Sequence, residues 1–264
     1  MTILDRIVEH KREELGGLMR ETPLKSVQAL ADAAPPPRDL VAALRSKLGV
    51  ALIAEVKRGS PSKGLLRPDL DVVSLALAYA RHGAAAISVL TDERFFQGSL
   101  ADLIRIRGAL EGATPLLRKD FILHPYQVYQ TRAAGADGLL LIAAVLSDED
   151  LAELLSLTRA LGMTALVEVR DQRELERVLP LSPRLVGANN RNLHDFSVNL
   201  ESCLALRPLA PDAVCFVAES GIHSPADVKR LAVARVNAML VGEALVTAPD
   251  VGAKVRELIG GGQN

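Results

Sequence analysis

Eight short apolar runs recur along the chain at spacings of roughly 20 to 35 residues, the combined length of a strand, a helix and two short loops. Each run ends in polar or glycine residues and precedes a longer segment with helical periodicity. This repeat constrains the fold more than any other feature of the sequence. The runs begin at Val50, Ala85, Thr114, Gly138, Thr164, Arg184, Val214 and Ala238.

The runs are continuously apolar rather than alternating, which indicates strands that are covered on both faces and therefore a parallel sheet. Eight such strands in 264 residues predict an α/β fold of the closed (β/α)8 type, the TIM barrel. A doubly wound open sheet is the alternative. No G-x-G-x-x-G follows the first run, which counts only weakly against that alternative.

The residues before the barrel, 1–48, are expected to form a helical extension that packs on a catalytic barrel at 49–260, within one domain overall. The first apolar residues recur at helical spacing. The glycine pair at 16–17 weakens any continuation of that helix. The run AAPPP at 33–37 requires a loop before a second, short helix near Arg38.

Charge and cysteine content limit the partners and the location. The formal net charge is −1 and no dense basic block with interleaved aromatics occurs, so we expect no nucleic-acid partner. Cys203 and Cys215 have no CxxC spacing and the histidines form no metal motif, so we expect neither disulfides nor a metal site. We expect neither a signal peptide nor a membrane span, because charges interrupt the first apolar residues and no apolar window approaches membrane length. We therefore expect a cytoplasmic protein with no membrane partner. We also expect a monomer or weak homo-oligomer, although none of these features determines the oligomeric state.

Polar side chains close five of the apolar runs, at the end of a barrel where active sites lie. Because these side chains come from different strands, we expect them to converge on one mouth. The candidates are Glu55, Lys57, Lys119, Glu168, Asn189, Arg191, Glu219 and Ser220.

Glu55 and Lys57 lie two residues apart at the end of the first run. Side chains alternate along a strand, so both are expected on the same face as Ala51 and Ile53. With these two residues filling the barrel, the charges reach its mouth. A purely structural ion pair that plugs the top of the barrel is the alternative.

Lys119 is a candidate general acid. Desolvation in a partly apolar mouth disfavours its charged form and nearby carboxylates favour it, and the balance decides whether it can release a proton near neutral pH. Arg118 is expected to face the helices and to extend outward. Glu168 is a candidate base or orienting group. The alternatives are a solvated lysine at a strand end and a glutamate that caps a helix or tethers a loop.

Two glycine-containing turns predict a phosphate site. AESGI after the seventh run and LVGEALV after the eighth leave backbone N–H groups exposed at a helix start, where phosphate binds. A phosphate site after strands seven and eight recurs in barrels of this type. The residues alone therefore indicate acid–base catalysis, without a metal, on a phosphorylated substrate.

Seven motifs carry a family resemblance that covers nearly the whole chain. In order, AEVKRGSPSKG, LTDERFFQGS, LLRKDFI, LVEV, GANNRNL, AESGI and LVGEALV resemble the indole-3-glycerol phosphate synthase family. The first motif and RKDF are the most specific parts, and the N-terminal ILDRIVEHKREEL is similar to that family's extra helix. The resemblance implies conversion of 1-(2-carboxyphenylamino)-1-deoxyribulose 5-phosphate into indole-3-glycerol phosphate in tryptophan biosynthesis, with release of carbon dioxide and water and without a cofactor.

The resemblance also implies catalytic roles. Lys119 is expected to protonate the ribulosyl carbonyl oxygen. Lys57 is expected to contact the substrate carboxylate or to donate a proton during dehydration. Glu168 and Glu55 are expected to supply the base and to hold the lysines in place. Which glutamate has which role stays open. Further implied contacts are Asn189, which belongs to the catalytic set, Arg191, Glu219 and Ser220, with Phe96, Phe121 and Leu193 around the anthranilate ring.

Ser60 and backbone groups around Ser220, Gly221, Gly242 and Glu243 are expected to bind the phosphate. Some family members have serine at the position of Glu243. A carboxylate beside a phosphate repels it, so only the backbone N–H of Glu243 is expected to contact the ligand, with the side chain turned away.

Two alternative functions stay open. One is another phosphate-binding barrel enzyme such as phosphoribosylanthranilate isomerase, which is expected to use a cysteine and an aspartate. Neither Cys203 nor Cys215 ends an early strand, which counts against it. The other is a barrel that binds a phosphometabolite without catalysis.

Overall fold

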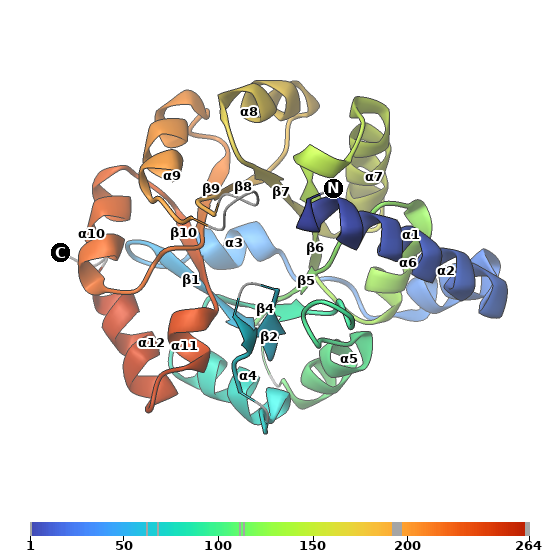
Figure 1. The fold of residues 1–264 in the computed structure, drawn as a ribbon, viewed down its shortest axis with the longest axis horizontal. Helices are drawn as coiled ribbons and strands as arrows, with labels where there is room; N and C mark the ends of the chain where they lie inside the picture. The colour runs from blue at the N-terminus through green and yellow to red at the C-terminus, as the bar shows by residue number, and fades with distance from the viewer. Residues whose placement is uncertain are drawn as a thin grey trace.

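The computed structural model describes residues 2–61, 63–67, 69–110, 112, 114–191 and 197–261. Eight strands close into a parallel barrel in the order β1-β10-β9-β8-β7-β6-β5-β4 (Figure 1). Each strand coincides with one of the eight apolar runs, so the predicted (β/α)8 barrel is confirmed. The strands are β1 (Ala51–Val56), β4 (Ala86–Leu90), β5 (Leu116–Lys119), β6 (Gly138–Ile142), β7 (Thr164–Val169), β8 (Leu185–Asn189), β9 (Cys215–Glu219) and β10 (Ala238–Val241).

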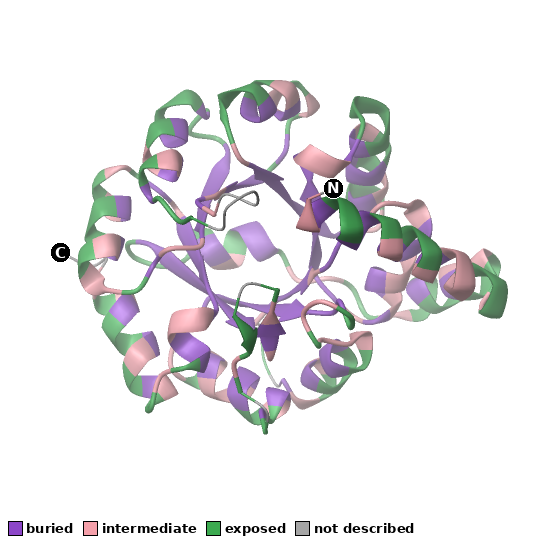
Figure 2. Ribbon diagram, in the orientation of Figure 1, coloured by how far each residue is buried: buried purple, intermediate pink, exposed green. Residues whose placement is uncertain are grey.

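Helices follow the strands and surround the barrel, with buried inner faces and exposed outer faces (Figure 2). A short antiparallel hairpin, β2 (Gly59–Ser60) and β3 (Gly64–Leu65), lies between β1 and the first of these helices. The helices are α4 (Val72–Arg81), α5 (Leu100–Ala109), α6 (Pro125–Ala133), α7 (Asp148–Ala160), α8 (Gln172–Val178), α9 (Glu201–Leu206), α10 (Pro225–Val233), α11 (Glu243–Val246) and α12 (Val251–Gly260), with 3-10 turns at Ala143–Val145, Leu179–Leu181 and Arg207–Leu209.

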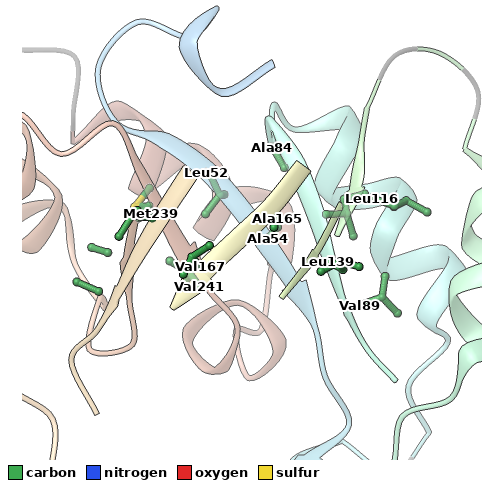
Figure 3. Packing of buried hydrophobic residues seen from close by; sticks show 14 of the residues in the cluster. Leu52, Ala54, Ala84, Val89, Leu116, Leu139, Ala165, Val167, Met239 and Val241 are labelled. Atoms are coloured by element: carbon green, nitrogen blue, oxygen red, sulfur yellow. The ribbon is translucent and has the colours of Figure 1, made fainter. Parts of the chain in front are cut away.

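The side chains of each strand alternate between two cores. In β1, Leu52 and Ala54 belong to the larger core between the barrel and the helices, part of which is shown in Figure 3. Ala51 and Ile53 belong to the core inside the barrel, as predicted. The alternation therefore places Glu55 on the interior face at the mouth.

Helix α1 (Ile3–Glu21) begins after Thr2, which forms a capping box with Asp5. The expectation that the glycines at 16–17 weaken its continuation was wrong. Leu15 packs with Val27 and Tyr126 just before the glycines, and the Tyr126 hydroxyl donates to the Leu18 carbonyl at 3.3 Å. This tertiary packing offsets the cost of about 1 kcal/mol for each glycine in a helix.

A helix that was not predicted, α2 (Leu24–Ala33), follows α1 and packs on α6. The predicted loop at 33–37 and the short helix after it are present, since α3 (Leu40–Arg45) begins two residues after Arg38. In the described part of the chain, no helix combines the length and apolar character of a membrane span.

Helices α1 and α3 lie at opposite ends of the barrel. Leu40 and Leu44 of α3 pack in the interior core with Ala51, Cys215 and Ala238, which each begin a strand, so α3 closes the amino end. In Figure 1, helix α1 begins in front of β6 and runs outward in front of α6, and its residues Ile3, Leu4 and Ile7 line the cavity at the carboxyl ends of the strands. This arrangement leaves the mouth as the open end, with α1 partly over it.

Candidate active site

The carboxyl ends of the strands surround a cavity that α1 partly covers. The residues predicted for the site line it together, apart from Leu193, which lies outside the described residues. Those that line the cavity are Glu55, Lys57, Ser60, Phe96, Lys119, Phe121, Glu168, Asn189, Arg191, Glu219, Ser220, Gly221, Gly242 and Glu243. Their convergence on one mouth is thus confirmed, while their individual roles stay predictions.

Several apolar residues of the cavity were not predicted. Three come from α1, and others come from the interior face of the strands. The stripe of the first helix was visible in the sequence, but the surface that it covers was not. These residues are Ile3, Leu4, Ile7, Leu140, Ile142 and Leu240.

Two ammonium groups and a shared carboxylate form the centre of the cavity. Lys57 Nζ lies 3.2 Å from Glu55 Oε1, and Lys119 Nζ lies 3.5 Å from Glu55 Oε2. Lys119 Nζ also lies 3.3 Å from Glu219 Oε2. Both lysine side chains are 15% exposed, so a ligand in the cavity can reach them. The Glu55–Lys57 pair is therefore one edge of a larger charged cluster.

Two glycines leave room for the carboxylates. A Cβ on Gly187 would lie 2.1 Å from Glu219 Oε1, and a Cβ on Gly242 would lie 2.5 Å from Glu55 Oε1. Such distances are well inside van der Waals contact, so a larger residue at either position would displace the carboxylate. The absence of a side chain at these positions fixes the arrangement of the charges.

Replacement of Gly242 by alanine is expected to lower kcat/KM by about 10- to 100-fold, because the displaced Glu55 no longer holds both lysines in position. Steady-state kinetics of the variant measure this loss. Gly108→Ala is the matched control, because a Cβ there meets nothing within 4 Å. Equal kcat/KM in the two variants would contradict the role given to the space at Gly242.

Charge balance explains the pKa shifts in the cluster. Burial raises the pKa of Glu219 to about 8, against the opposing effect of Lys119. Burial also raises the pKa of Glu168, whereas for Glu55 the two lysines outweigh burial and the pKa is lowered. Burial disfavours the Lys119 ammonium, but Glu219, Glu55 and Glu168 outweigh it and raise its pKa. With two ammonium groups and three carboxyls, the cluster is closest to neutral when one carboxyl keeps a proton.

The raised pKa of Glu219 predicts a pH-dependent stability. Between its ordinary pKa of 4.5 and about 8, the folded protein keeps a proton that the unfolded chain has lost. The free energy of unfolding therefore falls as pH rises through this window. Glutamine does not titrate, so Glu219→Gln should gain stability relative to wild type by more than about 1 kcal/mol between about pH 5 and pH 9. Urea unfolding at the two pH values measures the difference.

The control for this experiment is Glu149→Gln, at an exposed position in the first turn of α7. Its stability relative to wild type should stay constant across the same pH range. A Glu219→Gln variant that behaves like this control would show that Glu219 ionises normally in the folded protein.

Asn189 joins β8 to β9. Its Oδ1 accepts from the Arg191 N–H and from Ser220 Oγ, both at 3.0 Å. Its side chain also hydrogen-bonds Glu168, which opposes the rise in the pKa of that carboxyl. The register places Asn189 directly beside Glu219 in the neighbouring strand. Asn189 therefore orients one carboxylate of the cluster and the turn after β9 together.

The predicted phosphate residues lie along one rim of the cavity. Ser220 and Gly221 have φ values of 69° and 79°. This backbone conformation is rare for a serine and occurs at ligand-binding turns. The Glu243 carboxylate lies 3.5 Å from Lys63 Nζ and 4.0 Å from Arg191 Nη2. These cations offset the repulsion that Glu243 would exert on a bound phosphate.

Two aromatic rings form an apolar wall. Phe96 and Phe121 lie with their ring centroids 6.1 Å apart and their planes at 36°. Phe95, the residue before Phe96, packs against His10 of α1, with ring centroids 5.9 Å apart. The side chains of adjacent residues point apart, so only Phe96 of this pair reaches the cavity.

Arg118 faces the helices as predicted, but the expectation that it extends outward was wrong. Its side chain is 5% exposed, and its guanidinium donates to Thr91, Asp120, Gln130 and Thr131 at 2.8 to 3.1 Å. A guanidinium with this many partners is stable when buried. Among the described residues, no group of three or more His, Cys, Asp or Glu side chains could hold a metal ion.

Comparison with known proteins gives consistent matches along the whole chain. A family model described as indole-3-glycerol phosphate synthase matches residues 4–258. The chain is 53% identical over 266 residues to indole-3-glycerol phosphate synthase of Roseiflexus sp. (strain RS-1), covering 98% of this chain and 99% of that protein. It is 51% identical over 265 residues to the protein of the same name from Roseiflexus castenholzii, covering 98% of each.

Solved structures of lower identity share the fold. Tryptophan synthase subunit alpha from Legionella pneumophila str. Paris superposes with a TM-score of 0.62 at 16% sequence identity, covering 85% of this chain and 98% of that chain. At this identity the likeness shows the fold alone, and it agrees with the barrel described above.

Proposed function

The chain belongs to the indole-3-glycerol phosphate synthase family, a family of carboxy-lyases in tryptophan biosynthesis, and we propose how its barrel mouth performs the family's reaction. The enzyme converts 1-(2-carboxyphenylamino)-1-deoxyribulose 5-phosphate into indole-3-glycerol phosphate, carbon dioxide and water. The observation that carries the proposal is the convergence of two ammonium groups and three carboxyl groups beside an aromatic wall in one cavity.

Lys119 acts as the general acid of ring closure. The aromatic carbon that bears the carboxylate attacks the ribulosyl carbonyl, whose oxygen becomes an alkoxide unless it is protonated. An alkoxide is a stronger base than an amine, so an ammonium with a raised pKa can still donate to it. The same ammonium stabilises the negative charge that develops on the oxygen. The bond between the ring carbon and its carboxylate then breaks, which releases carbon dioxide and restores the aromatic ring.

Glu168 is the better candidate for the base of the dehydration step. A general base works best with a pKa near the working pH, and burial raises that of Glu168. Glu55 is held between two lysines that lower its pKa, so it suits the role of positioning both ammonium groups. Glu168 would take a proton from the methylene carbon beside the nitrogen while Lys57 protonates the hydroxyl that leaves the neighbouring ring carbon. Water is thus eliminated across this carbon–carbon bond, and the indole nitrogen keeps its proton.

The phosphate would lie on the rim formed by Ser60 and the turns after β9 and β10. The first N–H groups of a helix have no partner within that helix, and Gly242 and Glu243 begin α11. Arg191 and Lys63 add positive charge at the same rim. The anthranilate ring would then lie against the wall formed by Phe96 and Phe121, at the side that α1 covers.

We extend the proposal to the organisation of the protein. Residues 1–48 would form an extension on the catalytic barrel at 49–260, within one domain. The protein would act on a small phosphorylated substrate as a monomer or weak homo-oligomer. The net charge of −1 gives no attraction to nucleic acid. Both cysteines are free thiols, which suits the cytoplasm.

A substrate comparison tests the assignment against the isomerase alternative. The purified protein is given either N-(5-phosphoribosyl)anthranilate or the carboxyphenylamino substrate, and both the loss of each substrate and indole fluorescence are followed. We expect indole only from the second substrate. Turnover of phosphoribosylanthranilate alone would favour the isomerase and contradict the proposed chemistry.

A further inference from the structure

A lysine occupies the apolar stripe of α1. Leu4, Ile7, Val8 and Leu15 form the buried face of this helix, and Lys11 lies among them at helical spacing. Only 2% of its side chain is exposed. A lysine is almost never this buried unless its charge is paired. The helix therefore places a cation where packing alone would call for an apolar residue.

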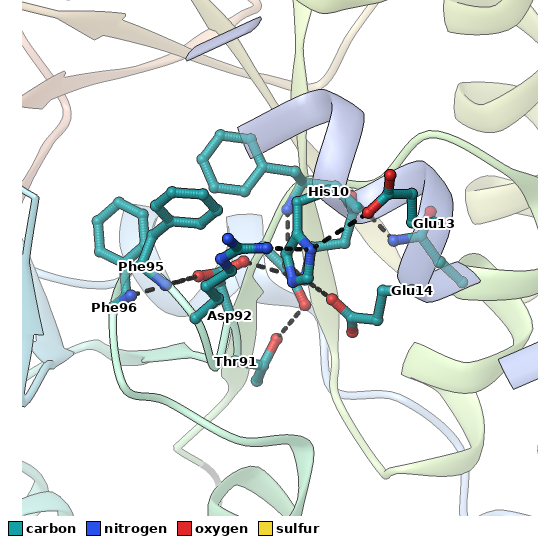
Figure 4. A network of polar contacts seen from close by, with 12 residues as sticks. His10, Glu13, Glu14, Thr91, Asp92, Phe95 and Phe96 are labelled. Atoms are coloured by element: carbon teal, nitrogen blue, oxygen red, sulfur yellow. Dashed lines mark hydrogen bonds and ion pairs between the residues drawn. The ribbon is translucent and has the colours of Figure 1, made fainter. Parts of the chain in front are cut away.

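The ammonium of Lys11 meets carboxylates from three elements. Its Nζ lies 3.1 Å from Asp92 Oδ2, 3.1 Å from Asp120 Oδ1 and 2.8 Å from Glu14 Oε2. Burial disfavours the ammonium, but Asp120, Asp92 and Glu14 outweigh it and raise the pKa of Lys11, so it stays charged. Figure 4 shows the part of this network around Asp92 and Glu14.

The two aspartates also hold the aromatic wall of the cavity. Asp92 Oδ1 accepts from the N–H groups of Phe95 at 2.8 Å and Phe96 at 3.2 Å, as Figure 4 shows. Asp120 Oδ1 accepts from the Phe121 N–H at 2.8 Å, and Asp120 directly follows Lys119. One ammonium on α1 is thus bonded to both carboxylates that fix the backbone of Phe96 and Phe121.

We propose that Lys11 is a positioning residue for the aromatic half of the substrate. Through Asp92 and Asp120 it ties α1, with Ile3, Leu4 and Ile7 at the cavity, to the loops that carry Phe96 and Phe121. The apolar residues of α1 and the two phenylalanine rings then form one rigid apolar surface around the ring of the substrate, which we call the ring slot. This inference rests on the proposed function, because the ring slot is proposed to bind the anthranilate ring of that substrate. Lys11 itself lies outside the cavity lining and touches no substrate.

The substitution Lys11→Met keeps the length and apolar stem of the side chain and removes the charge. Asp92 Oδ2 is then buried without a cation, and α1 loses its tie to the loops. We expect the KM for the carboxyphenylamino substrate and the Kd for indole-3-glycerol phosphate to rise by about 10- to 100-fold. The inhibition constant of glycerol 3-phosphate, which has no ring, should change by less than about threefold.

Lys25→Met is the matched control, because Lys25 is exposed on α2. It should leave all three constants unchanged. A Lys11→Met enzyme with unchanged KM and Kd would overturn the inference. An equal loss for the ringed and ringless ligands would also overturn it, because that result indicates general disruption of the barrel mouth.

A second variant covers the case in which Lys11→Met does not fold. In Asp92→Asn, the side-chain oxygen can still accept from Phe95 and Phe96, while the ion pair with Lys11 is lost. We expect the same selective loss for ringed ligands, at several-fold or more, and unchanged constants would overturn the inference. Failure of the proposed function would look different, since wild-type protein would then not convert the carboxyphenylamino substrate at all.

Discussion

Replacement of Lys119 by methionine is expected to lower kcat by about a thousandfold or more, while the substrate still binds. The variant loses both the proton donor and the positive charge beside the carbonyl oxygen, and each contributes orders of magnitude to a rate. Methionine keeps most of the side-chain volume, so the cavity should keep its shape. An interaction made only in the transition state lowers kcat and leaves binding of the ground state nearly unchanged.

Single-turnover kinetics and the Kd of indole-3-glycerol phosphate separate the two effects. The Kd should stay within about threefold of wild type, and Lys229→Met, at an exposed position of α10, should keep full activity. A fully active Lys119→Met enzyme would remove Lys119 from the chemistry. A noncatalytic barrel that only binds the phosphometabolite would show the same binding but no wild-type turnover.

Glu168→Gln is expected to lower kcat by about 10²- to 10⁴-fold, because the amide cannot accept the methylene proton during dehydration. Glutamine keeps the size of the side chain and its reach to Asn189. Decarboxylation should therefore still occur in the variant while dehydration is slowed. A ring-closed intermediate that has lost carbon dioxide but not water should accumulate. Rapid quenching followed by mass spectrometry detects this species, which is heavier than the product by one water.

Glu153→Gln, at an exposed position on α7, is the control and should behave like wild type. If Glu168→Gln is slow but releases no carbon dioxide, then Glu168 acts before decarboxylation, and the division of roles between Glu168 and Glu55 proposed above is wrong. The measurement thus addresses the point that the resemblance of the sequence leaves open.

The barrel could be predicted from the sequence because each of its strands is buried on both faces. A run such as GLLLI in β6 contains only apolar residues and is buried along its whole length. Such a run therefore predicts the position of a strand by itself. The convergence of Lys119 and Glu219 could be predicted for the same reason. Once strands are parallel and closed, their carboxyl ends must meet at one mouth.

What could not be predicted depends on contacts between distant segments. Helix α1 passes through its glycine pair because Tyr126, more than a hundred residues away, packs on it. The expectation that Arg118 extends outward was wrong, because the groups that accept hydrogen bonds from its guanidinium lie on α6 and just after β4. The buried charge of Lys11 gave no signal in the sequence, since KREE reads as a solvated face. These contacts follow from tertiary structure, which local patterns do not encode.

The most direct measurement of the central claim follows carbon dioxide and indole fluorescence together in one reaction. Wild-type protein is mixed with 1-(2-carboxyphenylamino)-1-deoxyribulose 5-phosphate, with Lys119→Met run in parallel. We predict that the wild type forms one carbon dioxide for each indole-3-glycerol phosphate. The variant should form neither product above background. Equal formation of both products by wild type and variant would contradict the claim that the lysine and glutamate cluster of the barrel mouth closes the ring.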